Sequence, residues 1–188
     1  MTDAASFSVL AFSGSLRKGS FNRMTLEAAK SLAPDGMSIE IFERLGDIPL
    51  YNEDIRGDGD PDAVNAVAAA IRNADAVLIS TPEYNYSVSG VLKNAIDWLS
   101  RAKPQPFKDK PLAIMGAAMG AHGTARAQYH LRQIFVFLEA HMLSRPEVFI
   151  GAAHTKFGED GSLNDDVAKD LIRQELEALR AWALRLAA

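Results

Sequence analysis

A hydroxyl-rich segment with one arginine and one lysine lies near the start of the chain, at residues 13–22. It follows a short apolar run and leads directly into a helical pattern. The backbone N–H groups and the dipole at a helix N-terminus attract anions. Ser15, Ser20 and Asn22 add short-range donors, and the forked guanidinium of Arg17 can bind two oxygens of one phosphate. The segment therefore predicts an anion site, with an ordinary serine-capped turn as the alternative.

Two common phosphate-binding motifs do not match this segment. Gly14 and Gly19 have the spacing of a nucleotide-triphosphatase loop, but Ser20 stands where that loop requires its lysine. The dinucleotide fingerprint G-x-G-x-x-G is also absent, because residue 16 is leucine. The chemistry that remains is suited to a terminal monophosphate.

A second distinctive segment, at residues 81–90, is rich in aromatic and amide side chains. Tyr84 and Tyr86 offer flat faces on which a planar ligand could stack, although they could instead pack beneath the loop. Asn85 can both donate and accept hydrogen bonds, as the edge of a heteroaromatic ring requires, although it could instead merely close a turn. A ligand with a phosphate tail and a planar head would use both segments, and flavin mononucleotide (FMN) fits that description.

Alternating strand and helix patterns surround these segments. Five strands are predicted, at residues 7–12, 37–42, 76–79, 112–115 and 147–150; the second shows an alternating pattern and the others are short, mainly apolar runs. Apolar residues at helical spacing predict helices at residues 20–32, 88–99, 124–140 and 164–186, and one that Asp60 caps and Pro61 begins. Residues 45–60 are expected to form an irregular loop.

Near-continuous apolar strands separated by helices indicate a parallel sheet covered on both faces. Right-handed crossovers then produce a three-layer α/β/α sandwich. Ligands of such sheets lie beyond the carboxyl ends of the strands, where the winding reverses. The loops at residues 13–22, 81–90 and 116–123 are therefore expected to form the functional site.

Length and composition limit the possible classes of function. The 188 residues suit one domain, and 20 basic against 24 acidic residues give a net charge of −4, without a global basic field for nucleic acid. The absence of cysteine excludes disulfides, thiol catalysis and Cys-ligated metals. The first six residues carry an acid where a secretory signal needs a base, and no apolar run approaches the roughly 20 residues that cross a bilayer. A cytoplasmic protein without membrane insertion is expected.

Four separated motifs lie between Val9 and Phe149. They are Gly14-Ser15-Leu16-Arg17-x-x-Ser20-x-Asn22, Pro82-Glu83-Tyr84-Asn85-Tyr86-Ser87, Leu92-Lys93-Asn94-Ala95-Ile96-Asp97-Trp98 and Gln128-Tyr129-His130-Leu131-Arg132. Together they resemble the bacterial NAD(P)H-dependent FMN reductase family. Within it, the sequence is most similar to the quinone reductases that are also described as chromate reductases.

The resemblance implies one flavodoxin-like domain over residues 1–188, with strand order 2-1-3-4-5 and non-covalently bound FMN. It implies a phosphate site made by Ser15, Arg17, Ser20, Phe21 and Asn22. It implies a ring site lined by Pro82, Glu83, Tyr84 and Asn85, with Ala118 and Gly120 at the pyrimidine edge. Many relatives carry a serine in the run 116–120, but this chain has none, so contacts from that run must be made by its backbone.

The activity implied is hydride transfer from NAD(P)H to FMN, followed by two-electron reduction of a quinone. Chromate, ferric complexes and azo compounds are further possible small-molecule acceptors. Because NAD(P)H and the acceptor would use the same exposed face of the flavin in turn, ping-pong kinetics are expected. The flavin carries the chemistry, so no catalytic side chain is expected. A flavodoxin-type electron carrier without a nicotinamide site is the alternative, although Arg17 favours the reductase because flavodoxins usually have a threonine-rich phosphate loop.

Other candidate chemistries are weaker. The four histidines lack metal-ligand spacing, and Ser87 and Ser89 do not form the G-x-S-x-G hydrolase motif. A receiver domain would need acids where Ser13 and Thr81 stand. A group of polar and aromatic side chains is expected near the helix at residues 124–140, either as a network within the chain or as a contact between subunits. Its members are Arg126, Tyr129, His130 and Glu147. Because flavoenzymes of this kind are commonly dimers or tetramers, we expect assembly through this region or the 88–101 helix.

Overall fold

The computed structural model describes residues 6–188. Residues 1–5, which contribute to the expectation that no secretory signal is present, lie outside the described residues. The described strands are β1 (Phe7–Ser13), β2 (Met37–Ile41), β3 (Ala76–Ser80), β4 (Pro111–Ala117), β5 (His141–Met142) and β6 (Val148–Ile150). The described α-helices are α1 (Phe21–Ser31), α2 (Glu53–Gly57), α3 (Asp62–Asn73), α4 (Gly90–Leu99), α5 (Ala125–Phe137) and α6 (Asp166–Ala187).

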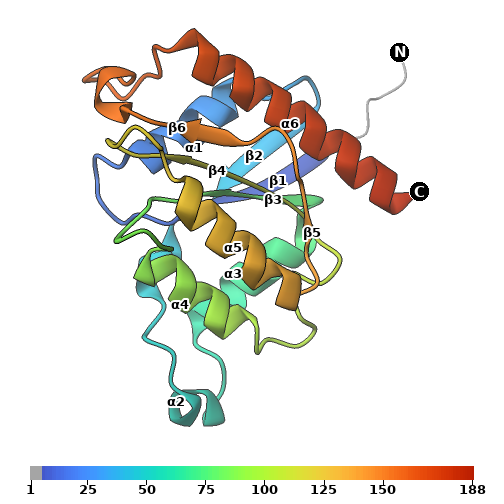
Figure 1. Ribbon diagram of the computed structural model, residues 1–188. Helices are drawn as coiled ribbons and strands as arrows, with labels where there is room; N and C mark the ends of the chain where they lie inside the picture. The colour runs from blue at the N-terminus through green and yellow to red at the C-terminus, as the bar shows by residue number, and fades with distance from the viewer. Residues whose placement is uncertain (1–5) are drawn as a thin grey trace.

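The strands form one parallel sheet in the order β2-β1-β3-β4-β5, and β6 also pairs with β4 (Figure 1). This is the flavodoxin-like order that the resemblance implies. The fifth position is shared by two short strands, because β5 pairs with the start of β4 and β6 pairs with its end. The prediction of strands missed β5, since its two residues are too few to give a periodic pattern.

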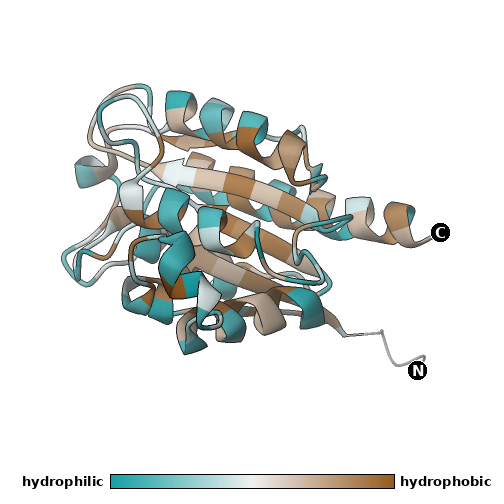
Figure 2. Cartoon of the chain, turned by 90° about the horizontal axis from the view of Figure 1, so that it is seen from below, coloured by the Kyte–Doolittle hydropathy of each residue, from teal (hydrophilic) through white to brown (hydrophobic). Residues whose placement is uncertain are grey.

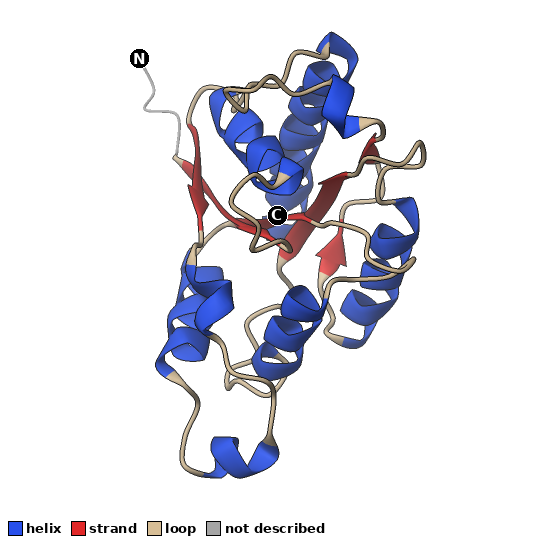
Figure 3. Ribbon diagram, turned by 90° about the vertical axis from the view of Figure 1, so that its left-hand side faces the viewer, coloured by secondary structure: helices blue, strands red, loops and turns tan. Residues whose placement is uncertain are grey.

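Helices cover both faces of the sheet (Figures 1 and 3). Helices α3, α4 and α5 bury their apolar sides with strand residues such as Leu10 and Phe12. Helices α1 and α6 bury theirs with Val9 and Ala11, which alternate with those residues along β1. Figure 2 shows the strands as mostly apolar bands between helices of mixed hydropathy. The continuous apolar runs in the sequence therefore come from strands buried on both sides.

Two expectations about local structure need correction. Asp60 was expected to cap a helix beginning at Pro61, but Pro61 is itself the N-cap and α3 begins at Asp62. The expected irregular loop at 45–60 contains a short 3-10 helix, Arg44–Asp47, and α2, which Asn52 caps by accepting the N–H of Asp54. Helix α2 lies at the tip of an arm that leads away from the sheet (Figure 1). Elements this short carry too few residues to show a period.

The winding of the sheet reverses beside β1. From β1 the chain passes to β2 on one side, and from β2 it crosses to β3 on the other. Ser13 at the end of β1 lies opposite Ser80 at the end of β3, so the loops that follow these strands begin as neighbours. Among residues 6–188, no helix has both the length and the apolar composition needed to cross a membrane.

Candidate active site

The loops after β1 and β3 meet at the carboxyl edge of the sheet. The hydroxyls of Ser15 and Tyr84 lie 3.2 Å apart, and Ser89 Oγ donates a hydrogen bond of 2.6 Å to the Gly14 carbonyl. A Cβ atom at Gly14 would lie 2.8 Å from Pro82 Cδ, so only glycine allows the two loops to approach this closely. The two segments that the sequence predicted as a phosphate site and a ring site thus share one rim.

The start of α1 has the features of an anion site. Ser20 caps the helix by accepting the Arg23 N–H at 3.4 Å, and within residues 6–188 no hydrogen bond uses the N–H groups of Phe21 or Asn22. The exposed Arg17 turns back over this end of the helix, with its guanidinium carbon 5.4 Å from the centre of the Phe21 ring. Two free backbone donors and one free cation therefore lie at one place.

Asn22 does not fill the role expected of its side chain. The side chain is buried: Nδ2 donates to the Ala117 carbonyl at 3.0 Å, and Oδ1 accepts from Ala117 N–H at 2.9 Å and from Ser80 Oγ at 3.0 Å. The expectation of a side-chain phosphate donor is wrong, because this amide joins α1 to the ends of β3 and β4. The group of Asn22 that remains available to a ligand is its backbone N–H.

Residues 84–87 form a tight hairpin. The N–H of each end residue, Tyr84 and Ser87, donates to the carbonyl of the other at 3.0 Å. Asn85 and Tyr86 have φ angles of 49° and 65°, the left-handed pair that closes a type I′ turn. Tyr84 and Tyr86 are 51% and 67% exposed, so the alternative in which they pack beneath the loop is wrong. The hairpin presents aromatic faces to solvent beside Ser15.

The Glu83 side chain points away from the rim, toward α5. The side chain is only 6% exposed, and its carboxylate accepts the N–H groups of Arg126 at 2.9 Å and Ala127 at 3.2 Å. It also accepts Arg126 Nε at 2.6 Å, and the Arg126 guanidinium lies 3.9 Å from the centre of the Tyr86 ring. The expectation that the Glu83 side chain lines the ring therefore needs correction. This pairing could not be predicted from the sequence, since residues 83 and 126 are far apart in the chain.

The third loop, after β4, packs against the second. A Cβ atom at Gly116 would overlap the Thr81 carbonyl and Thr124 Oγ1. The Ala118 N–H donates to Ile150 and its carbonyl accepts from Ala153, both at 3.0 Å, so the expected ligand contact from the Ala118 backbone is unsupported. Among the described residues, no hydrogen bond uses the N–H groups of Met119 or Gly120. Gly120 thus remains a candidate donor, and Met119 is one that sequence reasoning missed.

The group of polar and aromatic side chains expected near the helix at residues 124–140 is not one network. Arg126 pairs with Glu83, and His130 Nδ1 lies 2.9 Å from Ser87 Oγ. The Tyr129 ring packs against Phe149, and Glu147 lies 3.9 Å from Arg145. Two of its members, Arg126 and His130, bind the 81–90 loop instead of one another.

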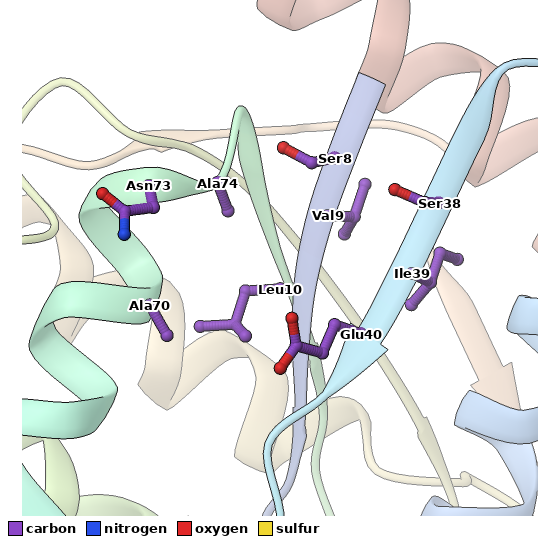
Figure 4. Close-up of a pocket in the computed structure, with 9 residues that line it drawn as sticks. All are labelled: Ser8, Val9, Leu10, Ser38, Ile39, Glu40, Ala70, Asn73 and Ala74. Atoms are coloured by element: carbon purple, nitrogen blue, oxygen red, sulfur yellow. The ribbon is translucent and has the colours of Figure 1, made fainter. Parts of the chain in front are cut away.

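A separate hollow of about 550 Å³ lies between β1, β2 and the end of α3 (Figure 4). It contacts β1 at Ser8 to Leu10, whereas the candidate loops follow the last residue of that strand. Glu40 is its ionisable lining residue, and no cation lines it. A phosphate would be repelled there, so this hollow is not part of the rim site.

The groups at the rim fit FMN. A phosphate would meet the positive end of α1 and Arg17, and a flat ring would meet the exposed tyrosines. The free N–H groups of Met119 and Gly120 are suited to the carbonyl oxygens of a pyrimidine ring. A hollow of about 320 Å³ adjoins the first loop, and its lining includes Ser15, Arg17, Lys18 and Arg23, together with Glu43, whose charge is paired with Arg23.

Comparisons with known proteins agree with this arrangement. Residues 7–155 match the family described as NADPH-dependent FMN reductase. An NAD(P)H-dependent FMN reductase of Pseudomonas aeruginosa is 57% identical over 95% of this chain and 96% of its own length. A quinone reductase of Escherichia coli is 45% identical over the same shares of the two chains. The structure of FerB, a flavoenzyme NAD(P)H:(acceptor) oxidoreductase from Paracoccus denitrificans, superposes with a TM-score of 0.86 at 34% identity, covering 95% of this chain and 98% of FerB. The chain therefore belongs to the NADPH-dependent FMN reductase family.

Proposed function

We propose that this chain is an FMN-dependent NAD(P)H:quinone oxidoreductase, with residues 1–188 acting as one FMN-binding domain. The observation that carries the proposal is the contact between Ser15 and Tyr84, which joins a phosphate-type loop to an aromatic hairpin at one rim. The names of its relatives, FMN reductase and quinone reductase, support the same activity. They favour it over the flavodoxin-type electron carrier, which would lack a nicotinamide site.

The residues of the chain bind and orient the flavin. Arg17, the Ser15 hydroxyl and the first N–H groups of α1 hold the phosphate. Pro82, Tyr84 and Asn85 face the ring, and the N–H groups of Met119 and Gly120 donate to its pyrimidine edge. The chemistry that bound FMN would supply is two-electron transfer: it would accept a hydride from NAD(P)H and then pass two electrons and one proton to a quinone, which takes its second proton from solvent.

The rim is open, and this openness determines which substrates can reach the ring. Tyr84 and Tyr86 are exposed, and Met119 is 64% exposed on the neighbouring loop. NAD(P)H and a planar acceptor would occupy the same face in turn, which predicts ping-pong kinetics. Chromate, ferric complexes and azo compounds are further proposed acceptors, since an exposed reduced ring can pass electrons to any of them.

We further propose a homodimer or homotetramer, assembled through the region of α5. Val136 and Phe137, at the end of this helix, are 76% and 85% exposed. Adjacent exposed apolar side chains form a patch of the kind that marks protein–protein contact sites. Light scattering is expected to give a mass above that of one chain, and a monomer at micromolar concentration would contradict the proposal.

Stopped-flow absorbance tests the activity directly. The FMN-loaded protein is mixed anaerobically with NADH or NADPH, and the reduced protein is then mixed with a quinone. We expect the flavin absorbance to bleach with at least one nucleotide and to return with the quinone. Initial rates at several quinone concentrations should give parallel double-reciprocal lines. A purified protein that takes up no FMN, or one that neither nucleotide bleaches, would contradict the proposal.

A further inference from the structure

Glu83 is a buried carboxylate in an otherwise exposed hairpin. Its two backbone partners, the N–H groups of Arg126 and Ala127, belong to the first turn of α5. N–H groups in the first turn have no partner within their own helix. The residue at the N-cap position, Thr124, makes no capping hydrogen bond with its side chain. Glu83 thus caps α5 from a loop that lies more than 40 residues earlier in the chain.

The third partner of Glu83 is the side chain of Arg126, which in turn contacts the hairpin. Glu83 Oε1 accepts Arg126 Nε at 2.6 Å and also pairs with Arg126 Nη2. The guanidinium so held lies 3.9 Å from the centre of the Tyr86 ring. Cations at this distance from an aromatic face are attracted to it. Residue 83 therefore holds Arg126, and Arg126 holds residue 86 of the same hairpin.

The hairpin needs support of this kind. A two-stranded turn with two backbone hydrogen bonds is not stable by itself in water. Tyr86 also adopts a positive φ, which is unfavourable for a bulky side chain. Asn85 adopts the left-handed conformation more readily, but it has no hydrogen bond to α5 among the described residues. The pairing of Glu83 with Arg126 is the charged contact that links this turn to α5, and it acts alongside the contacts of Ser87 with His130 and of Tyr84 with Ser15.

We propose that Glu83 is a positioning residue for the flavin ring, acting through Arg126 and Tyr86 without touching the ring itself. The inference rests on the proposed function, because it concerns the face that the hairpin presents to FMN. The phosphate loop meets the hairpin at the Ser15–Tyr84 contact, but it is also held by contacts that do not involve residues 83–86, namely Ser89 to Gly14 and the Ser20 cap of α1. Loss of the Glu83 charge should therefore loosen the ring site while leaving the phosphate site intact.

The variant that tests this is Glu83→Gln in the full-length chain. The amide oxygen can still accept the two backbone N–H groups, but the charge that holds Arg126 is lost. Loss of a charge-assisted hydrogen bond is large enough to weaken FMN binding about tenfold. We expect that weakening in a fluorescence titration, together with a shifted absorption band of bound FMN. Hydrogen exchange at the amides of residues 84–87 should become faster.

Two further variants separate positioning from general stability. If Glu83 acts through Arg126, then the double variant Glu83→Gln/Arg126→Met should bind FMN no more weakly than Arg126→Met alone. Asp75→Asn is the matched control, since Asp75 accepts the N–H and hydroxyl of Ser8 at 2.7 Å and 2.8 Å at the opposite edge of the sheet. This control should lose stability but keep the affinity and spectrum of the unchanged protein.

Each outcome bears on the inference. Unchanged FMN affinity and spectrum in Glu83→Gln would overturn it, as would additive effects in the double variant or an equal loss in Asp75→Asn. Should Glu83→Gln fail to fold, Arg126→Met carries the test, and FMN affinity equal to that of the unchanged protein would overturn the inference. A starting protein that does not bind FMN would instead refute the proposed function.

Discussion

Arg17 is the side chain whose removal should affect FMN binding most directly. It lies over the first turn of α1, and its Nη1 is 3.2 Å from the position that a Cβ atom would take at Gly19. In the part of the chain that the structure describes, no ion pair includes Arg17. Its neighbour Arg23, by contrast, pairs with Glu27 and Glu43. The charge of Arg17 is therefore left for an anion.

The expected size of the effect follows from this geometry. A hydrogen bond to a charged group contributes about 1.5–3 kcal/mol, which corresponds to roughly 10- to 100-fold in affinity. Arg17 is exposed, so solvent screening places the expectation for Arg17→Ala at the lower end, about tenfold weaker FMN binding. A titration of FMN fluorescence with the flavin-free protein measures it. Raising the salt concentration should weaken binding to the unchanged protein more than to the variant.

Lys18→Ala is the matched control for this experiment. It removes one positive charge from the same loop, but an ammonium group lacks the forked donors that grip two phosphate oxygens. We expect its effect to be smaller, at most about threefold, because an exposed charge acting only at long range is screened. Equal losses in the two variants would show that only net charge matters. Unchanged affinity in Arg17→Ala would show that the guanidinium does not reach the phosphate.

Three further predictions concern the fold around the site. Burial raises the pKa of Glu175 well above its ordinary range, with Arg132 only partly opposing it. The contribution of the neutral Glu175 carboxyl to the free energy of unfolding is therefore complete at pH values below its pKa in the unfolded chain. This contribution is lost as the pH rises through its pKa in the folded protein. In Glu175→Gln, the free energy of unfolding measured with urea should not show this decline with pH. Gly116→Ala should lower the melting temperature and weaken FMN binding, because the new methyl group overlaps the Thr81 carbonyl and Thr124. Asn22→Ala should lower the free energy of unfolding by roughly 2–4 kcal/mol, measured with urea, since it leaves buried donors without partners.

The layers of the fold could be predicted from the sequence because the signal there is long and repeated. Strand β3 is buried at every position and apolar from Ala76 to Ile79, and helices such as Asp62–Asn73 bury one regular face. The parts that could not be predicted are too short for a period: β5 has two residues and α2 has five. Their conformation depends on neighbours that are distant in the chain, as when His141 pairs with Pro111.

The site was predictable in its loops but less so in its side chains. Residue type shows that Asn22 and Glu83 can hydrogen-bond, but it does not show whether the partner is a ligand or the protein itself. In both cases the partner is the protein. Ser15, Arg17 and Tyr84, which remain partly or fully exposed at the rim, are the side chains still available for the proposed role. The free N–H of Met119 gave no signal in the sequence, since a backbone donor is independent of residue type.

The hydrogen bonds that hold the loops of the rim also affect how tightly the site can bind a ligand. Asn22 ties α1 to β4, Glu83 ties the hairpin to α5, and Ala118 ties the third loop to β6. Each loop at the rim is thus fixed by at least one hydrogen bond to another element of the protein. A preformed site loses less conformational entropy when it binds, so few direct contacts suffice for affinity. The rigidity of the rim and the openness of its aromatic face are therefore compatible, because the bonds that hold the loops lie behind the surface that meets the flavin.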